Sequence, residues 1–151
     1  MTTPGPAATG TERRTVVDAD GRAKAYRPLP TADRTAAVIA GMRAYDDGDF
    51  FEAHELMEPA WMGTDDPAER ELIQGLIKLA AADVHGVRGN PRGVARNLEG
   101  ARDRLRRVPD GDAIGGLRFD LPGLLLAIDR RLAEIAADRP THPIPVSWSS
   151  R

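Results

Sequence analysis

The stretch that decides the fold is residues 66–85, DPAERELIQGLIKLAAADVH. It opens with an aspartate cap, a proline at the first helical position and Glu69 two residues later, an arrangement typical of a helix start. Apolar residues then recur at helical spacing, at Leu72, Ile73, Leu76, Ile77, Leu79 and Ala80. The pattern predicts a helix from about residue 67 to 87, and the small residues at 80–82 would let a neighbouring helix approach closely.

Four more helices are expected around this one, and each has a start or stop signal in the sequence. Thr31 and Asp49 are candidate cap residues, and Asn90 before Pro91 repeats the Asp-Pro arrangement. Pro59 falls inside the second helix, which therefore either kinks or ends near that position. The four helices are predicted from Thr31 to Gly48, from Phe50 to Glu58 or beyond, from Pro91 to about Val108, and from Asp120 through Ile135.

Short connections make consecutive helices antiparallel, so the expected fold is all-α. We predict a compact antiparallel bundle of four to five helices, composed of two helical hairpins plus a C-terminal helix. The expected organisation is a flexible N-terminal arm at residues 1–30, a helical domain at 31–138 and an extended Pro-rich tail at 139–151. Residues 15–17 are a candidate extended piece within the arm, and Trp148 is a candidate for docking the tail.

The chemically suggestive run is Phe51-Glu52-Ala53-His54-Glu55-Leu56-Met57-Glu58, on the second predicted helix. At about 100° per residue, His54 and Glu58 lie about 40° apart, with Phe51 to one side and Glu55 on the flank. We expect this cluster on an inward helix face. A carboxylate beside an imidazole suits acid–base chemistry, and the spacing also lets both side chains reach one metal ion. The same spacing equally suits a structural Glu–His contact, and the residues alone leave both interpretations open.

The third helix offers groups that could complete a site. Gln74, Lys78, Ala81 and His85 form a polar-to-small stripe along it. In a simple hairpin His54 lies level with about Gln74, which places His85 roughly 15 Å further along and opposes a site with two histidines. Glu71 would then lie near Glu58, in a carboxylate-rich site suited to iron or manganese, or would simply complement the helix dipole.

Several of these residues together resemble one known family. The matching elements are the run at 51–55, Glu58, Trp61, Gln74-Gly75-Leu76-Ile77, Ala80-Ala81, His85, and Gly89-Asn90 with Gly93 and Ala95. Over roughly residues 36–108 the chain is similar to the bacterial and archaeal family called domain of unknown function 309. The resemblance implies an all-α bundle, and the family is sometimes labelled a predicted metal-dependent hydrolase.

The resemblance also implies candidate site residues. His54 and Glu58 become the expected metal ligands, and Glu55 and His85 the expected catalytic residues. Phe51, Trp61, Gln74 and Asn90 are the supporting positions. The cofactor implied is a divalent metal, with zinc, manganese and iron as the candidates.

Composition narrows the classes of function. The chain has 151 residues, 41% of them hydrophobic, which is enough for one core, and it has no cysteine, which excludes disulfides and thiolate sites. A net charge of −2 gives no field that would attract nucleic acid, and the arginines of residues 92–107 are interrupted by Glu99 and Asp103. No apolar run is long enough to span a bilayer. We therefore expect a cytoplasmic protein that binds neither nucleic acid nor membrane.

Two functional hypotheses follow. The first is a metal-dependent hydrolase with a His-Glu-x-x-Glu site, acting on an unknown small-molecule substrate. The second is a non-catalytic helical interaction module, with a homodimer among its expected states, whose His/Glu cluster is a structural polar network and whose grooves bind a peptide or protein partner.

Overall fold

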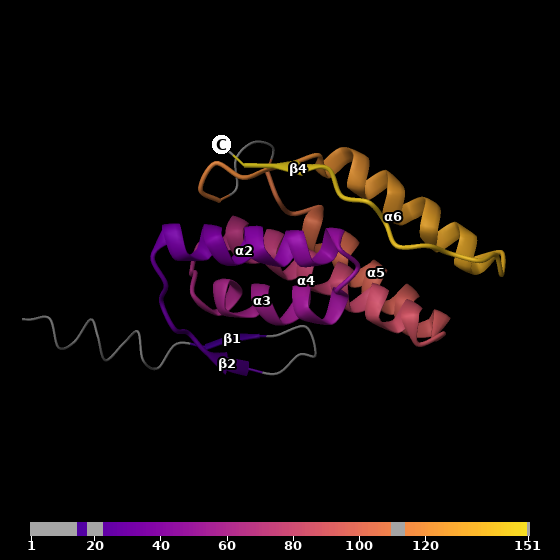
Figure 1. Cartoon of the computed structure of the whole chain (residues 1–151), viewed down its shortest axis with the longest axis horizontal. Helices are drawn as coiled ribbons and strands as arrows, with labels where there is room; N and C mark the ends of the chain where they lie inside the picture. Colours follow the sequence, from indigo (N-terminus) through magenta and orange to yellow (C-terminus); the bar gives the residue numbers. More distant parts are fainter. Residues whose placement is uncertain (1–14, 18–22, 110–113, 151) are drawn as a thin grey trace, which may run out of the picture.

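The computed structural model describes residues 15–17, 23–109 and 114–150. Within them the chain forms an all-α bundle, as predicted, in which each helix packs against the next one in sequence (Figure 1). Helices α2 and α3 form one hairpin, α4 and α5 a second, and α6 follows on α5. The helices are α2 (Thr31–Asp46), α3 (Phe50–Met62), α4 (Pro67–Val87), α5 (Pro91–Leu105) and α6 (Leu121–Ala136).

Three helix starts are fixed by side chains close in sequence, as the pattern indicated. The Asp66 carboxylate accepts a hydrogen bond from the Glu69 backbone N–H at 3.1 Å. Asn90 and Asp120 accept in the same way from Gly93 and Gly123, at 3.2 and 3.0 Å. Because each cap satisfies a backbone donor three residues ahead, it can be recognised without tertiary information.

Other helix ends differ from prediction. Thr31 is the first residue of α2 and follows Pro30, so it is not the cap. Asp49 occupies the cap position of α3, as predicted, but makes no side-chain cap hydrogen bond. Helix α3 runs through Pro59 to Met62, because Pro59 is exposed and water can satisfy the carbonyl left without its N–H partner. Helix α5 ends at Leu105 rather than near Val108, since the chain tightens there into i→i+3 hydrogen bonds.

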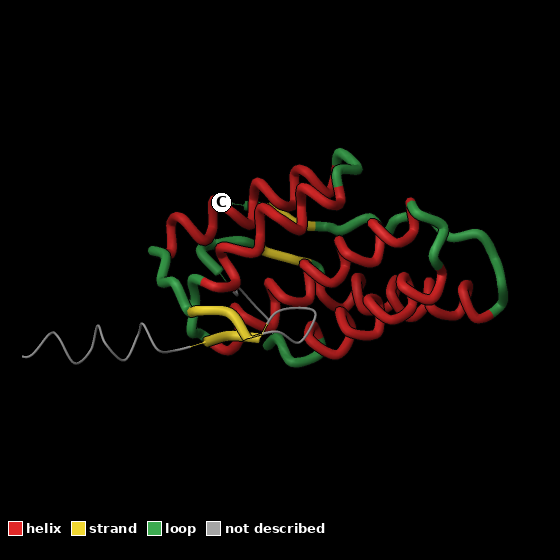
Figure 2. Tube along the Cα trace, turned by 90° about the horizontal axis from the view of Figure 1, so that it is seen from below, coloured by secondary structure: helices red, strands yellow, loops and turns green. Residues whose placement is uncertain are grey.

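The structure also contains short strands. Strands β1 (Thr15–Val17) and β2 (Ala23–Ala25) pair antiparallel beside the bundle (Figure 2), so the expected extended piece within the arm is present. Further along the arm, the N–H groups of Arg27 and Leu29 donate to the carbonyls of Met62 and Gly63 at the end of α3. Residues 1–14 and 18–22 of the predicted arm lie outside the described residues.

The C-terminal segment runs back along α6 and ends as a strand (Figure 1). Strand β4 (Trp148–Ser149) pairs antiparallel with β3 (Arg118–Phe119). The Trp148 indole N–H donates to the Asp46 carboxylate at 2.9 Å, which is the docking expected of this residue. Ile144, midway along the segment, is fully buried. The segment is therefore fastened to both α2 and the loop before α6.

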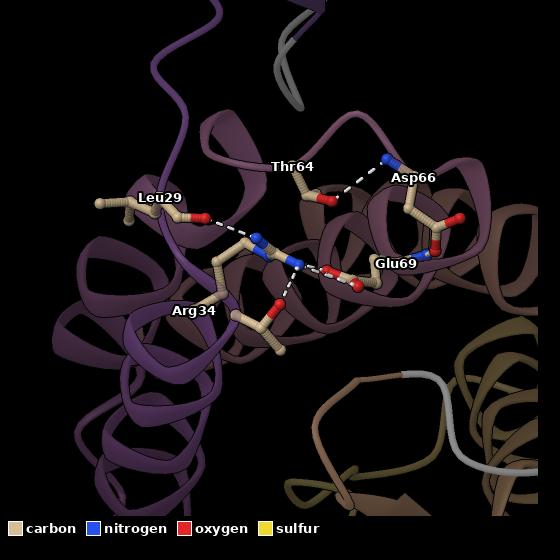
Figure 3. Close-up of polar contacts among 6 residues, drawn as sticks. Leu29, Arg34, Thr64, Asp66 and Glu69 are labelled. Carbon is tan, nitrogen blue, oxygen red and sulfur yellow. Dashed lines mark hydrogen bonds and ion pairs between the residues drawn. The ribbon is translucent and has the colours of Figure 1, made fainter.

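Apolar side chains from all five helices meet in one core, to which α4 contributes most. An ion pair closes the end where α2 and α4 begin (Figure 3). Arg34 donates through Nε and Nη2 to the two carboxylate oxygens of Glu69, at 2.9 and 3.2 Å. Arg34 also donates to the Leu29 carbonyl and to the Thr31 hydroxyl. One guanidinium thus joins α2, α4 and the segment that enters α2.

Candidate functional site: the α3–α4 groove and a buried carboxyl

Helix α3 turns an apolar face to the core. Its buried residues are Phe50, Ala53, Met57, Ala60 and Trp61. His54 and Glu58 are half-buried at the margin of this face, and Phe51 and Glu55 are exposed. The expectation that the His/Glu cluster faces inward is therefore wrong, because the positions at helical spacing with Phe50 and Ala53 fill the inward face instead. Trp61, expected as a supporting residue, is part of the core.

His54 contacts two other residues of α3, Glu55 and Phe51. Its Nδ1 lies 3.2 Å from a carboxylate oxygen of Glu55. Its ring lies nearly parallel to that of Phe51, with 6.5 Å between centroids and 11° between planes. The imidazole thus links an exposed carboxylate to an exposed aromatic ring. The arrangement can orient Phe51 toward solvent.

His85 has a different set of contacts, at the corner between α4 and α5. The Asn90 amide nitrogen lies 3.1 Å from His85 Nδ1, so Asn90 donates and Nδ1 accepts. Gly93 packs directly on this ring, since a Cβ at position 93 would lie 2.4 Å from Nδ1. Asn90 also caps α5. His85 and Asn90 therefore both stabilise the corner between α4 and α5.

A groove lies between the start of α3 and the end of α4. It encloses about 400 Å³ and is lined by Phe50, Phe51, Val84 and Val87, together with Gly48, Asp49, Glu52 and Arg88. The first turn of α3 is therefore beside the last turn of α4.

The expected axial offset of roughly 15 Å between His54 and His85 stays a prediction. Among the described residues, however, no group of three or more His, Asp and Glu side chains is arranged to hold a metal ion.

Two polar residues of α4 have other surroundings than expected. Glu71 forms ion pairs with Arg104 and Arg107 of α5, at 2.9 and 3.0 Å. Burial raises the pKa of Glu71, but the hydrogen bonds from both arginines outweigh burial and hold the pKa below its usual value. Gln74 is fully buried, and neither atom of its amide has a hydrogen-bond partner in the described part of the chain.

A second buried polar cluster, around Tyr45 and Asp83, was not predicted from the sequence. The Tyr45 hydroxyl lies 2.6 Å from an Asp83 carboxylate oxygen and 2.7 Å from the Ile144 carbonyl oxygen. Burial raises the pKa of Asp83 to about 6, although the Tyr45 hydrogen bond and the Arg131 charge lower it. Burial and the neighbouring Asp83 also raise the pKa of Tyr45. One signal could have been read: Asp83 follows Leu76 and Leu79 at helical spacing, on an apolar face.

Asp83 also lines a second cavity, of about 140 Å³, between the helices and the C-terminal segment. Its polar wall includes Arg131, Thr141 and His142, and its apolar wall includes Val94, Leu98 and Ile144. A small cavity with a buried carboxyl has the features of a ligand site.

Fold and site define an all-α bundle with an exposed aromatic groove and a buried carboxyl under its C-terminal segment. Residues 38–97 match the family described as Domain of unknown function (DUF309), so the resemblance seen in the sequence is confirmed. No curated protein and no solved structure matches the chain. In the described residues, no helix is both long enough and apolar enough to cross a membrane.

Proposed function

We propose that the chain is a non-catalytic helical module that binds a protein partner in the α3–α4 groove. One observation carries the proposal. The described part of the chain exposes three large hydrophobic side chains, Phe51 at 63%, Val87 at 77% and Leu126 at 66%. Two of the three, Phe51 and Val87, line the same groove. Exposed apolar residues that gather at one concave site are typical of an interface.

The charges around the groove favour one kind of partner. Asp49 and Glu52 line it and are exposed, and Glu55 follows one turn further along α3. Arg88 is the basic residue of the lining. An apolar side chain flanked by lysine or arginine would fill the groove and face the acidic rim. We therefore propose a basic, apolar segment of a protein as the ligand.

The motif residues have a role in this proposal without catalysis. His54 stacks on Phe51, and Glu55 is within hydrogen-bond distance of His54. An aromatic ring held in one orientation loses less entropy when it binds than a freely rotating ring does. In this interpretation Phe51 is the contact, and His54 and Glu55 position it.

Peptide titration monitored by NMR tests the proposal. The probes are two short peptides with the same central leucine and phenylalanine, one flanked by lysines and the other by glutamates. We expect the basic peptide to shift resonances of residues 48–55 and 84–88, and Phe51→Ala to weaken its binding at least tenfold. Leu126→Ala is the matched control, because Leu126 is equally exposed on α6. Equal binding of both peptides, or equal effects of both variants, would refute the groove as the site.

The metal-dependent hydrolase is the second candidate, and the His54–Glu55 contact favours it. His54 and Glu58 alone supply fewer ligands than the three or four that zinc takes from proteins, so we derive no reaction through a metal. The test is metal analysis of untagged protein offered zinc, manganese or iron. Stoichiometric metal that is lost in folded His54→Ala and Glu58→Ala would favour the hydrolase over the binding module. Cytoplasmic localisation and a homodimer remain predictions.

A further inference from the structure

The inference concerns the Tyr45 hydroxyl, and Tyr45 does not line the α3–α4 groove. This hydroxyl is placed between two acceptor oxygens, one of Asp83 at 2.6 Å and the carbonyl of Ile144 at 2.7 Å. All three residues are buried. A phenol carries one proton and can donate one hydrogen bond of this kind. With Asp83 ionised, one of the two short oxygen–oxygen contacts therefore has no proton in it.

Protonation of Asp83 resolves this conflict. The carboxylic acid then donates to the Tyr45 oxygen, and Tyr45 donates to the Ile144 carbonyl, so that both contacts are hydrogen bonds. An unpaired buried acceptor is costly, so the structure with both bonds is favoured. We propose that Asp83 is a proton-binding latch, which fastens the C-terminal segment at Ile144 when it is protonated and loosens it when it is ionised.

The charged and titratable groups that face Asp83 come from three elements. From α2 come Tyr45 and, beyond it, Asp46, which holds the Trp148 indole. From α6 comes Arg131, which donates to Glu134 at 2.7 Å and to the Pro143 carbonyl at 3.3 Å. His142 of the C-terminal segment lines the same cavity.

Helix α5 contributes only apolar side chains to this cavity, Val94 and Leu98. The charge of Arg131 favours the ionised form of Asp83, but its guanidinium also donates hydrogen bonds to Glu134 and to the Pro143 carbonyl. Burial outweighs the charge of Arg131, and the balance places the titration of Asp83 close to neutral pH, with a pKa of about 6.

The latch matters because the segment that it holds covers the cavity of about 140 Å³. Thr141, His142, Pro143 and Ile144 form one side of that cavity, and Asp83 lies on the opposite helix. Loosening Ile144 would therefore expose Asp83 and the apolar wall to solvent. At the cavity, Arg131 also donates to the Pro143 carbonyl at 3.3 Å. The β3–β4 pair and the Trp148–Asp46 bond lie nearer the C-terminus, away from the cavity.

Hydrogen exchange measured by NMR on the full chain tests the latch. The quantity compared is the protection factor of the Ile144 and Val146 amides between pH 5 and 7.5, corrected for the intrinsic exchange rate. We expect the wild-type protection to fall about tenfold over this range, roughly the effect of one hydrogen bond. Amides of α4 within the core, such as Leu76, serve as the internal reference.

Two variants should fix the latch in opposite states. In Asp83→Asn the amide donates to Tyr45 at every pH, so protection should stay high at pH 7.5. In Tyr45→Phe the chain of bonds is absent, so protection should be low at pH 5. His142→Gln is the matched control, since it removes a titratable group at the same cavity and should keep the wild-type dependence.

Three results would overturn the latch. They are a wild-type protection factor that does not change with pH, a pH dependence that persists in Asp83→Asn, and one that disappears in His142→Gln. Should Tyr45→Phe fail to fold, the comparison of wild type with Asp83→Asn and His142→Gln still decides.

Discussion

The ion pair between Arg34 and Glu69 should stabilise the fold by an amount that a double-mutant cycle can measure. The two side chains are 13% and 12% exposed, and they meet through two hydrogen bonds in the bidentate geometry that arginine and carboxylate favour. The variants are Arg34→Ala, Glu69→Ala and the double variant. The pair joins residues 35 positions apart, so it acts on tertiary structure and not on one helix.

The cost in unfolding free energy depends on which charged group each alanine variant leaves without its partner. Arg34→Ala leaves the Glu69 carboxylate mostly buried without its partner, which costs about 3 kcal/mol at the low end of the range for buried pairs. Glu69→Ala costs less, about 2 kcal/mol, because Arg34 still donates to the Leu29 carbonyl and the Thr31 hydroxyl. In the double variant neither charge remains, so we expect a coupling free energy of about 2 kcal/mol.

Urea unfolding followed by circular dichroism supplies the four free energies. The matched control is the cycle on Arg102 and Asp129, whose nitrogen–oxygen distance of 3.1 Å is similar but whose side chains are 26% and 48% exposed. Solvent screens this pair, and its coupling should stay below about 0.5 kcal/mol. A coupling for Arg34 and Glu69 no larger than that of the control would refute the argument from burial.

Three further predictions concern packing, pH and the groove. Gly93→Ala should destabilise the protein by about 1 to 3 kcal/mol in urea unfolding, because the added carbon would lie 2.4 Å from His85 Nδ1. Gly86→Ala, whose nearest contact is 3.8 Å away, should be neutral or stabilising. Asp83 has a folded pKa of about 6 against 3.8 for the free group, so its proton stabilises the fold by up to about 3 kcal/mol below pH 4. That stabilisation is lost as pH rises through 6, and Asp83→Asn should remove this dependence when unfolding is measured from pH 4 to 8. Phe51→Ala should stay within about 0.5 kcal/mol of wild type, whereas Trp61→Ala should cost about 3 to 5 kcal/mol; a large loss for Phe51→Ala would assign that ring to the core.

The features predicted correctly from the sequence are local. Asp66, Asn90 and Asp120 each accept a hydrogen bond from a backbone N–H three residues ahead. Their role as helix caps can therefore be predicted from the nearby residues alone. The helix from Pro67 to Val87 was predicted with its observed bounds, because a cap, a proline and an apolar stripe all agreed. The extended piece at 15–17 was likewise visible as a run of β-branched residues.

The features missed depend on distance in sequence. Tyr45 meets Asp83 across 38 positions and Ile144 across 99, and no spacing rule connects such residues. The orientation of α3 was also misjudged. A run with polar and apolar residues at helical spacing allows several inward faces, and packing against α2 and α4 selected the one built on Ala53 and Met57.

The motif that suggested catalysis therefore has a different physical setting from the one expected of an acid–base centre. His54 is half-buried, lies within hydrogen-bond distance of the exposed Glu55 and stacks on the exposed ring of Phe51. Burial raises the pKa of another carboxyl, Asp83, which lines the cavity under the C-terminal segment. We therefore propose partner binding in the α3–α4 groove and proton binding at Asp83. Phe51→Ala should change the first without the second, and Asp83→Asn the reverse.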